Sequence, residues 1–192
     1  MARKKMLEKS LLWLALGLAG AALPAAEPTS FQASSPDISS GQPIAAKFIY
    51  QGFGCTGQNV SPALMWKNAP PGARSFAVMV HDPDAPTGGA GFWHWVVVDI
   101  PAGTGFISQG AGGTDGKRLP AGSRQIASDF GTPGWGGPCP PAGDKPHHYN
   151  FTVYALKVDR LDLPANATAS LAGFMVNANT LAKATFTGLY GR

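Results

Sequence analysis

The chain has 192 residues, which is enough for one domain with a substantial core, and its formal net charge at pH 7 is +4. Residues 1–26 carry four of its 15 basic side chains and one of its 11 acidic ones, so 11 basic and 10 acidic residues remain beyond them. A domain this close to neutrality lacks the dense positive field that nucleic-acid binding requires, and we exclude nucleic acid as a partner.

The first 26 residues have the pattern of a secretory signal peptide. Arg3, Lys4 and Lys5 give a basic start, and a mainly apolar run covers residues 11–23. This run is too short to cross a membrane easily, because a spanning helix needs roughly 20 apolar residues. We therefore expect export, although an uncleaved membrane anchor is the alternative interpretation.

Cleavage is expected between Ala22 and Ala26, where small residues follow the apolar run. No cysteine follows this run closely, which argues against a lipoprotein anchor. The mature protein would then consist of a flexible lead-in at residues 27–43 and a single domain at residues 44–192. We expect this protein to be periplasmic or secreted.

Cys55 and Cys139 are the only cysteines of the chain. Unpaired thiols are a liability in an oxidising compartment, so export favours one disulfide between them. A bond across a loop of this length would stabilise the fold by about 4 kcal/mol in the chain-entropy model. Two separate buried thiols are the alternative.

In chain order, the sequence predicts strands and loops with one helical stretch. The 25 glycines and 17 prolines favour turns and oppose long helices. Apolar runs and two-residue alternation predict strands at 45–50, 74–81, 92–100, 149–158 and 185–191, and a shorter one ending at Trp66. The helical stretch is 163–184. Because loops rather than crossover helices separate the strands, we predict a mainly β fold built on an antiparallel sheet or sandwich.

Residues 102–147 show no periodicity, and a loop this long inside a compact domain favours a functional role. Polar side chains gather in two segments around it. The first, "HDPDAPTGGAGFWHW", contains Asp82, Asp84 and His94, and the second, "GWGGPCPPAGDKPHHYNF", contains His147 and Tyr149. Strand pairing can bring these two segments together.

Four motifs follow one another along the chain and overlap these segments in part: "NVSPALMW", "DPDAPT", "WHWVVVDIP" and "GGPCPPAGDKPHHYNFTVYAL". In this respect the chain resembles the phosphatidylethanolamine-binding protein (PEBP) family, and within it the bacterial YbhB/YbcL-type branch of Raf-kinase-inhibitor-like proteins. The resemblance runs from about Phe48 to Tyr190. Four motifs in the same order make it specific, whereas "DPDAP" alone would not.

The resemblance implies a β-sandwich-like fold with a large central antiparallel sheet, short peripheral helices near the C-terminus and a small anion-binding pocket. We expect no metal and no cofactor. The chain has no obvious match to a C-terminal tyrosine that some eukaryotic members contribute. Transferred residue by residue, the ligand-binding set is Asp82, Asp84, His94, Pro140, Pro141, His147 and Tyr149.

These residue types suit the binding of a phosphate-like anion. Imidazole N–H groups and a tyrosine hydroxyl are donors that need little reorganisation. A carboxylate such as Asp82 can fix an imidazole tautomer or accept a proton from a monoprotonated phosphate, and Asp84 is expected to support the imidazoles. We further expect a cis peptide bond at Ala85–Pro86, turning the chain so that Asp82 faces the site.

The neighbouring side chains are expected to have structural roles. His148 should point to solvent, since it alternates with His147 along the strand. Trp93 and Trp95 should share the strand face opposite His94 and be buried there.

We interpret the chain as an exported binding protein for a phosphate-type anion or a phospholipid headgroup, with regulation of a partner protein as a further role. A metal-dependent hydrolase using His and Asp ligands is the second hypothesis, although no His-x-His or HExxH spacing supports it. A protease- or kinase-inhibitor-like interaction module is the third, and it rests on family analogy alone. The sequence leaves open a peripheral lipid contact, a homodimer and the identity of any protein partner.

Overall fold

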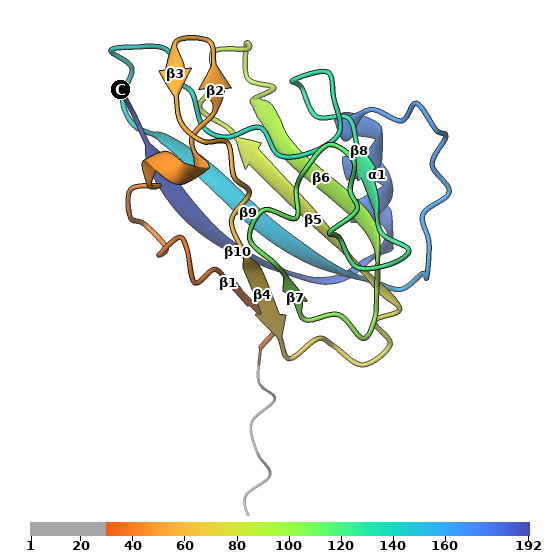
Figure 1. Cartoon of the computed structure of the whole chain (residues 1–192). Helices are drawn as coiled ribbons and strands as arrows, with labels where there is room; N and C mark the ends of the chain where they lie inside the picture. Colours follow the sequence, from red (N-terminus) through yellow and green to blue (C-terminus); the bar gives the residue numbers. More distant parts are fainter. Residues whose placement is uncertain (1–29) are drawn as a thin grey trace, which may run out of the picture.

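The computed structural model describes residues 30–192, so the expected signal peptide and its cleavage point lie outside the described residues. Its main element is a five-stranded sheet in the order β10–β9–β5–β6–β8 (Figure 1). Every neighbouring pair is antiparallel, which confirms the predicted mainly β fold. The strands are β5 (Ser75–Asp82), β6 (Phe92–Pro101), β8 (Arg124–Ile126), β9 (His147–Leu156) and β10 (Thr180–Tyr190).

Two smaller sheets and one α-helix accompany the main sheet in the described part of the chain. β1, β4 and β7 form a three-stranded sheet, and β2 and β3 form a hairpin. The bounds are β1 (Gln32–Ser34), β2 (Gln51–Gly52), β3 (Cys55–Thr56), β4 (Leu64–Lys67), β7 (Phe106–Ile107) and α1 (Ala169–Asn179). Within residues 30–192, no helix has the length and apolarity to span a membrane.

Both faces of the five-stranded sheet are covered. Tyr149, Phe151 and Val153 alternate along β9 and pack in one core with residues of the three-stranded sheet. Helix α1 packs against the opposite face, where its Ala172 joins a second core around Val96. Burial on both faces explains why β5 and β6 have nearly continuous apolar sequences.

Residues 45–50 do not form the predicted strand. They contain one turn of 3-10 helix at Ala46–Phe48, closed by the main-chain bond from Ile49 N to Ala46 O. Phe48 and Ile49 are nevertheless buried in the larger core. An apolar run this short identifies a buried segment without fixing its secondary structure.

The helical stretch predicted at 163–184 contains one helix, α1. This helix begins at Ala169 and ends at Asn179, so it is shorter than predicted at both ends. Thr168 caps its start, where its hydroxyl accepts a hydrogen bond from Leu171 N at 3.2 Å. At its end the chain passes directly into β10 at Thr180. The apolar pattern continues across this junction, so it does not mark the boundary.

The described part of residues 27–43 is bound to the rest of the domain, in contrast to the flexible lead-in expected. β1 pairs with β4. Ser35 Oγ donates to Ala63 O at 2.6 Å, and Gly41 N donates to Thr187 O at 2.7 Å. Polar side chains and main-chain groups hold this segment, and neither gives a strong periodic signal in the sequence.

A β-bulge in β6 sets the direction of His94. β5 pairs with Trp95 and then with Trp93, so His94 is the extra residue. Trp95 lies in the core shared with the three-stranded sheet, whereas Trp93 packs on the α1 side. The expectation that both tryptophans share one face is therefore wrong. The bulge turns His94 toward Tyr149, and their ring centroids are 5.1 Å apart.

Candidate ligand-binding site

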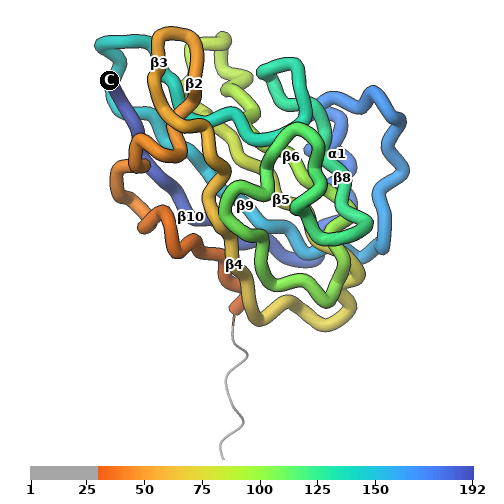
Figure 2. The backbone as a smooth tube through the Cα atoms, in the orientation of Figure 1, coloured from red at the N-terminus to blue at the C-terminus, as the bar shows by residue number. Residues whose placement is uncertain are grey.

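Three loops that are far apart in the sequence meet at one end of the five-stranded sheet (Figure 2). They are the β2–β3 hairpin, the β5–β6 connection and the segment that leads into β9. Residues from all three line a cavity of about 170 Å³. Six of the seven predicted ligand-binding residues are in its lining, namely Asp82, His94, Pro140, Pro141, His147 and Tyr149. The seventh, Asp84, is not.

A disulfide between Cys55 and Cys139 fastens two of these loops, with a Cα–Cα distance of 6.0 Å. Cys139 itself lines the cavity and is followed by Pro140 and Pro141. The prolines limit the backbone freedom of this wall. The disulfide therefore holds the proline wall against the β2–β3 hairpin.

Asp82 and His147 form a buried hydrogen-bonded pair in the cavity wall. Their residues are 3% and 4% exposed, and Asp82 Oδ2 lies 2.8 Å from His147 Nδ1. Because an ionised carboxylate only accepts hydrogen bonds, Nδ1 of His147 carries a proton. On the other side of the ring, Nε2 lies 3.4 Å from Oδ2 of the half-exposed Asp144. His147 is thus placed between two carboxylates.

The turn after Asp82 is made without a cis peptide bond. All peptide bonds within residues 30–192 are trans, so the prediction of a cis bond at Ala85–Pro86 is wrong. Instead, Asp82 Oδ1 accepts a hydrogen bond from Asp84 N at 2.9 Å, and Thr87 N donates to Ala85 O at 2.7 Å. The short aspartate side chain thus shapes the turn and fixes its own carboxylate.

His94 is held in one tautomer by the main chain. Its Nδ1 lies 2.7 Å from Gly136 O, and a carbonyl only accepts, so Nδ1 carries the proton. Burial lowers the pKa of His94 to about 4, although the bond to Gly136 opposes this shift. The ring is therefore neutral at pH 7. Its Nε2 has a lone pair and makes no hydrogen bond with the described residues.

Tyr149 brings an unused donor to the same cavity. Its hydroxyl is buried and makes no hydrogen bond of normal geometry with the described residues, although the Asp82 carboxylate is close enough to affect its pKa. Burial raises the pKa of Tyr149, and the charge of Asp82 raises it further, so the phenol keeps its proton. Buried polar groups are normally paired, and an unpaired one in a cavity wall marks a position for a ligand or water.

Asp84 and His148 form a second pair outside the cavity. Asp84 Oδ2 lies 2.8 Å from His148 Nδ1 and accepts a second bond from His148 N at 2.7 Å. The main-chain N–H of His148 is the largest cause that lowers the pKa of Asp84. The structure thus places Asp84 beside the exposed His148, so the expectation that Asp84 supports the cavity imidazoles is not met. His148 is exposed, as its alternation with His147 predicts.

Aromatic walls of the cavity were missed in the sequence. Phe53, Phe92 and Phe130 line it, and the Phe130 ring lies within 6.1 Å of the other two. Phe53 is at the tip of the β2–β3 hairpin and Phe130 is in the long aperiodic loop, so no periodic signal marks either of them. Phe92 is the first residue of β6 and lies two residues before His94. Of the three phenylalanines, it is the one that strand spacing indicates as a neighbour of His94.

Comparison with known proteins identifies the family. The model of the phosphatidylethanolamine-binding protein family matches residues 34–191. YbcL of Escherichia coli is 48% identical over 165 residues, which cover 86% of this chain and 90% of YbcL. YbhB of the same organism is 41% identical over 156 residues, covering 81% of this chain and 97% of YbhB. The chain belongs to the phosphatidylethanolamine-binding protein family.

Solved structures show the same PEBP fold. The crystal structure of E. coli YbcL, described as a member of the mammalian PEBP family, matches with a TM-score of 0.83 at 48% identity. This match covers 85% of the present chain and 99% of YbcL. A PEBP homologue from Chlamydia trachomatis matches with a TM-score of 0.70 at 27% identity, over 85% and 98% of the two chains.

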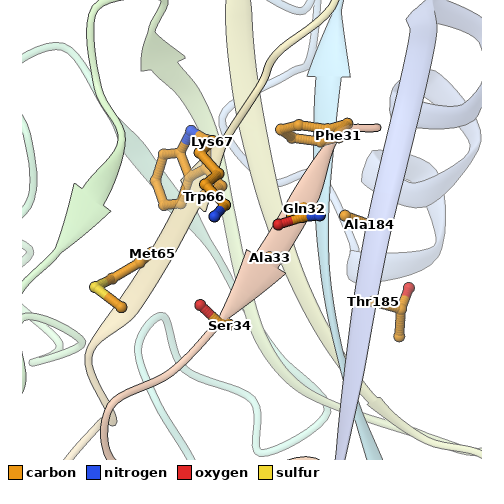
Figure 3. Close-up of a pocket in the computed structure, with 9 residues that line it drawn as sticks. All are labelled: Phe31, Gln32, Ala33, Ser34, Met65, Trp66, Lys67, Ala184 and Thr185. Atoms are coloured by element: carbon orange, nitrogen blue, oxygen red, sulfur yellow. The ribbon is translucent and has the colours of Figure 1, made fainter. Parts of the chain in front are cut away.

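A larger hollow of about 600 Å³ lies elsewhere on this PEBP domain, between β1, β4 and β10 (Figure 3). Phe31, Met65 and Trp66 line it, and Lys67 is its only titratable side chain. It contains no pair of acid and base, so we do not regard it as the functional site. Volume alone is a poor guide to a site that must recognise polar groups.

The described residues of the PEBP domain contain no group of three or more His, Cys, Asp or Glu side chains placed to hold a metal ion. The site is instead a cavity with apolar walls and a few polar atoms. These are the carboxylate of Asp82, the Nε2 of His94, the hydroxyl of Tyr149 and the ring of His147. Such a set can bind a small polar ligand and exchange a proton with it.

Proposed function

We propose that this chain is an exported binding protein whose cavity takes a phosphate-type group, as a free anion or as a phospholipid headgroup. The observation that carries the proposal is the buried hydroxyl of Tyr149, which has no partner among the described residues. It lies beside His94, whose Nδ1 is already used, so Nε2 is left for a ligand. A protonated phosphate oxygen at this place would accept a hydrogen bond from the Tyr149 hydroxyl and donate one to His94 Nε2.

The size and walls of the cavity support a small ligand. Its volume of about 170 Å³ is below the roughly 300–1,000 Å³ of pockets for drug-sized molecules. A headgroup suits this volume, and acyl chains would lie outside. The phenylalanine walls exclude water and thereby strengthen the hydrogen bonds made inside.

The charges of the cavity favour a ligand that brings or takes up a proton. Asp82 would repel a phosphate dianion, and neutral His94 presents a lone pair. A phosphate O–H can donate to His94 Nε2, so that one proton is shared between ligand and ring. Since the second pKa of a phosphate monoester is about 6, affinity should be nearly constant between the pKa of His94 and pH 6.

Above about pH 6 the free ligand is a dianion and Nε2 of His94 is unprotonated. Formation of each complex then requires the uptake of one proton from solution. The affinity should then fall about tenfold per pH unit. Calorimetry with phosphoethanolamine at pH 5–8.5, in buffers of different ionisation enthalpy, measures both the slope and the number of protons taken up. A flat profile over this range contradicts proton-coupled binding.

Binding itself is tested with inorganic phosphate and phosphoethanolamine as separate ligands. His94→Ala should lower the affinity for both at least tenfold, because it removes the ring that shares the proton. His148→Ala is the matched control, since it removes an imidazole that lies outside the cavity, and its affinity should stay within about twofold. Equal affinities for wild type and His94→Ala would disprove the proposed site. Phosphoethanolamine binding without phosphate binding would identify a headgroup as the ligand.

Export is part of the same proposal. The Cys55–Cys139 disulfide is typical of oxidising compartments. A relative from Mycobacterium tuberculosis, 42% identical over 145 residues, is named a putative lipoprotein. Cell fractionation should recover the chain outside the cytoplasm with no free thiols and without residues 1–26. Recovery of the reduced, full-length chain from the cytoplasm would contradict export.

A further inference from the structure

Asn59 lies outside the cavity but binds the segment that borders it. Its Nδ2 donates to Trp135 O at 3.2 Å, and its Oδ1 accepts from Gly137 N at 2.8 Å. One side chain thus holds the two residues on either side of Gly136. Asn59 is itself fixed by a main-chain bond from its N to Ile49 O at 2.8 Å.

His94 binds the same segment through the residue in the middle. Gly136 O accepts from His94 Nδ1 at 2.7 Å, and Gly136 N donates to His94 O at 3.0 Å. The segment is also closely packed, because a Cβ at Gly136 would lie 2.2 Å from the Phe130 ring. The Gly136 peptide is therefore held by Asn59, His94 and Phe130.

We propose that Asn59 is a positioning residue that selects the tautomer of His94. By fixing residues 135–137, it keeps the Gly136 carbonyl directed at Nδ1, so the ring's single proton stays there and Nε2 remains an acceptor. The consequence for ligand binding rests on the proposed function. Because Nε2 has no proton of its own, a phosphate dianion binds only with proton uptake.

Asparagine fits this role for two separate reasons. Its backbone has φ +52°, a left-handed conformation that asparagine tolerates better than most residues. Its amide is both donor and acceptor, and the structure uses both functions. Aspartate would keep the bond from Gly137 N but would place a carboxylate oxygen against Trp135 O. Glycine would keep the backbone conformation and remove both bonds.

The direct test is the ring nitrogen NMR spectrum of His94 in the ligand-free protein at pH 7. Wild type should show a protonated Nδ1 and an unprotonated Nε2. Asn59→Gly should show a mixture in which the Nε2–H tautomer is clearly populated, and Asn59→Asp a smaller fraction of it. Unchanged Nδ1–H tautomers in both variants would overturn the proposal. Aspartate serves as the second variant if the glycine variant folds poorly.

A matched control separates this effect from general loosening of the chain. Asn68 also has a left-handed backbone, with φ +58°, and its Nδ2 donates to Ser30 O at 3.3 Å away from the cavity. Asn68→Gly makes the same backbone change and removes one exposed hydrogen bond, so it should destabilise the fold by no more than Asn59→Gly does and leave the His94 tautomer unchanged. A tautomer shift in this control as well would count against a specific role of Asn59.

The functional readout is the pH dependence of phosphoethanolamine affinity between pH 7 and 8.5. In Asn59→Gly the Nε2–H tautomer donates to the dianion directly, so the slope should fall from about tenfold to about threefold per pH unit or less. A slope equal to that of wild type would overturn the proposal. If the wild type binds neither phosphate nor phosphoethanolamine, the proposed function fails, whereas the NMR result still decides the role of Asn59.

Discussion

Two aspartate–histidine pairs lie side by side in this protein and differ in almost everything except their geometry. Asp82–His147 and Asp84–His148 both have oxygen–nitrogen distances of 2.8 Å. In the inner pair the side chains are 4% and 5% exposed, and in the outer pair 41% and 56%. The inner pair lines the cavity and the outer pair faces solvent. Burial, rather than the contact distance, therefore distinguishes a candidate site from a surface ion pair.

The alternation of two sequence segments produces this difference. In β9, His147 and His148 point to opposite sides, as successive strand residues do. Across from them, Asp82 ends β5 and Asp84 follows in the turn that Asp82 itself stabilises. Two aspartates that are two residues apart thus pair with two adjacent histidines. The proline and phenylalanine walls enclose only the Asp82–His147 pair.

The largest expected difference between the two pairs is in stability. His147→Ala leaves the buried carboxylate of Asp82 without its partner, and loss of one member of a buried pair costs about 3–5 kcal/mol. His148→Ala removes the same residue type one position along and should cost at most about 1 kcal/mol. Urea unfolding followed by tryptophan fluorescence measures both. Equal losses for the two variants would mean that the inner pair behaves as a surface pair.

Sequence reasoning located the polar half of the cavity better than its apolar half. Asp82, His94, His147 and Tyr149 lie in contiguous motifs, and the resemblance carried each of them to its position. Phe130 comes from a loop without periodicity, and only the folded chain shows which side chains such a loop turns inward. Short motifs describe local chemistry, whereas a wall assembled from separate loops depends on tertiary packing.

The direction of His94 shows the limit of strand periodicity. Alternation along β6 places Trp93 and Trp95 together, opposite His94. The bulge adds one residue to β6, which puts His94 and Trp95 on the same side and Trp93 on the other. A bulge has no reliable sequence signal, so the residue could be chosen from the sequence but its orientation could not.

The next prediction concerns the unpaired hydroxyl that accompanies the inner pair. Tyr149→Phe removes a buried donor that has no partner in the described residues, so the free energy of unfolding should stay equal or rise slightly. The affinity for phosphoethanolamine should fall about tenfold or more, because hydrogen bonds to charged groups contribute about 1.5–3 kcal/mol. Calorimetry and urea unfolding of the same sample give both quantities.

Tyr154→Phe is the control for that experiment. Tyr154 lies on the same strand but packs in the core on the α1 side, away from the cavity. Its substitution should leave the affinity unchanged. If Tyr149→Phe lost stability and kept its affinity, the hydroxyl would have a structural partner and no contact with the ligand.

The smallest effect is expected for the outer pair. Asp84→Asn should cost at most about 1 kcal/mol, because both side chains are largely solvated and the interaction is screened by salt. The pKa of Asp84 is lowered from its ordinary 3.8, chiefly by the His148 N–H, so its contribution is present above about pH 4 and is lost as the pH falls through the lower folded value. Urea unfolding of both proteins at pH 7 and pH 3 should show a smaller difference at pH 3 than at pH 7. Since Asp84 does not line the cavity, the affinity for phosphoethanolamine should change by less than about twofold. A tenfold loss in this variant would mean that the outer pair also acts on the ligand, and burial would no longer separate the two pairs.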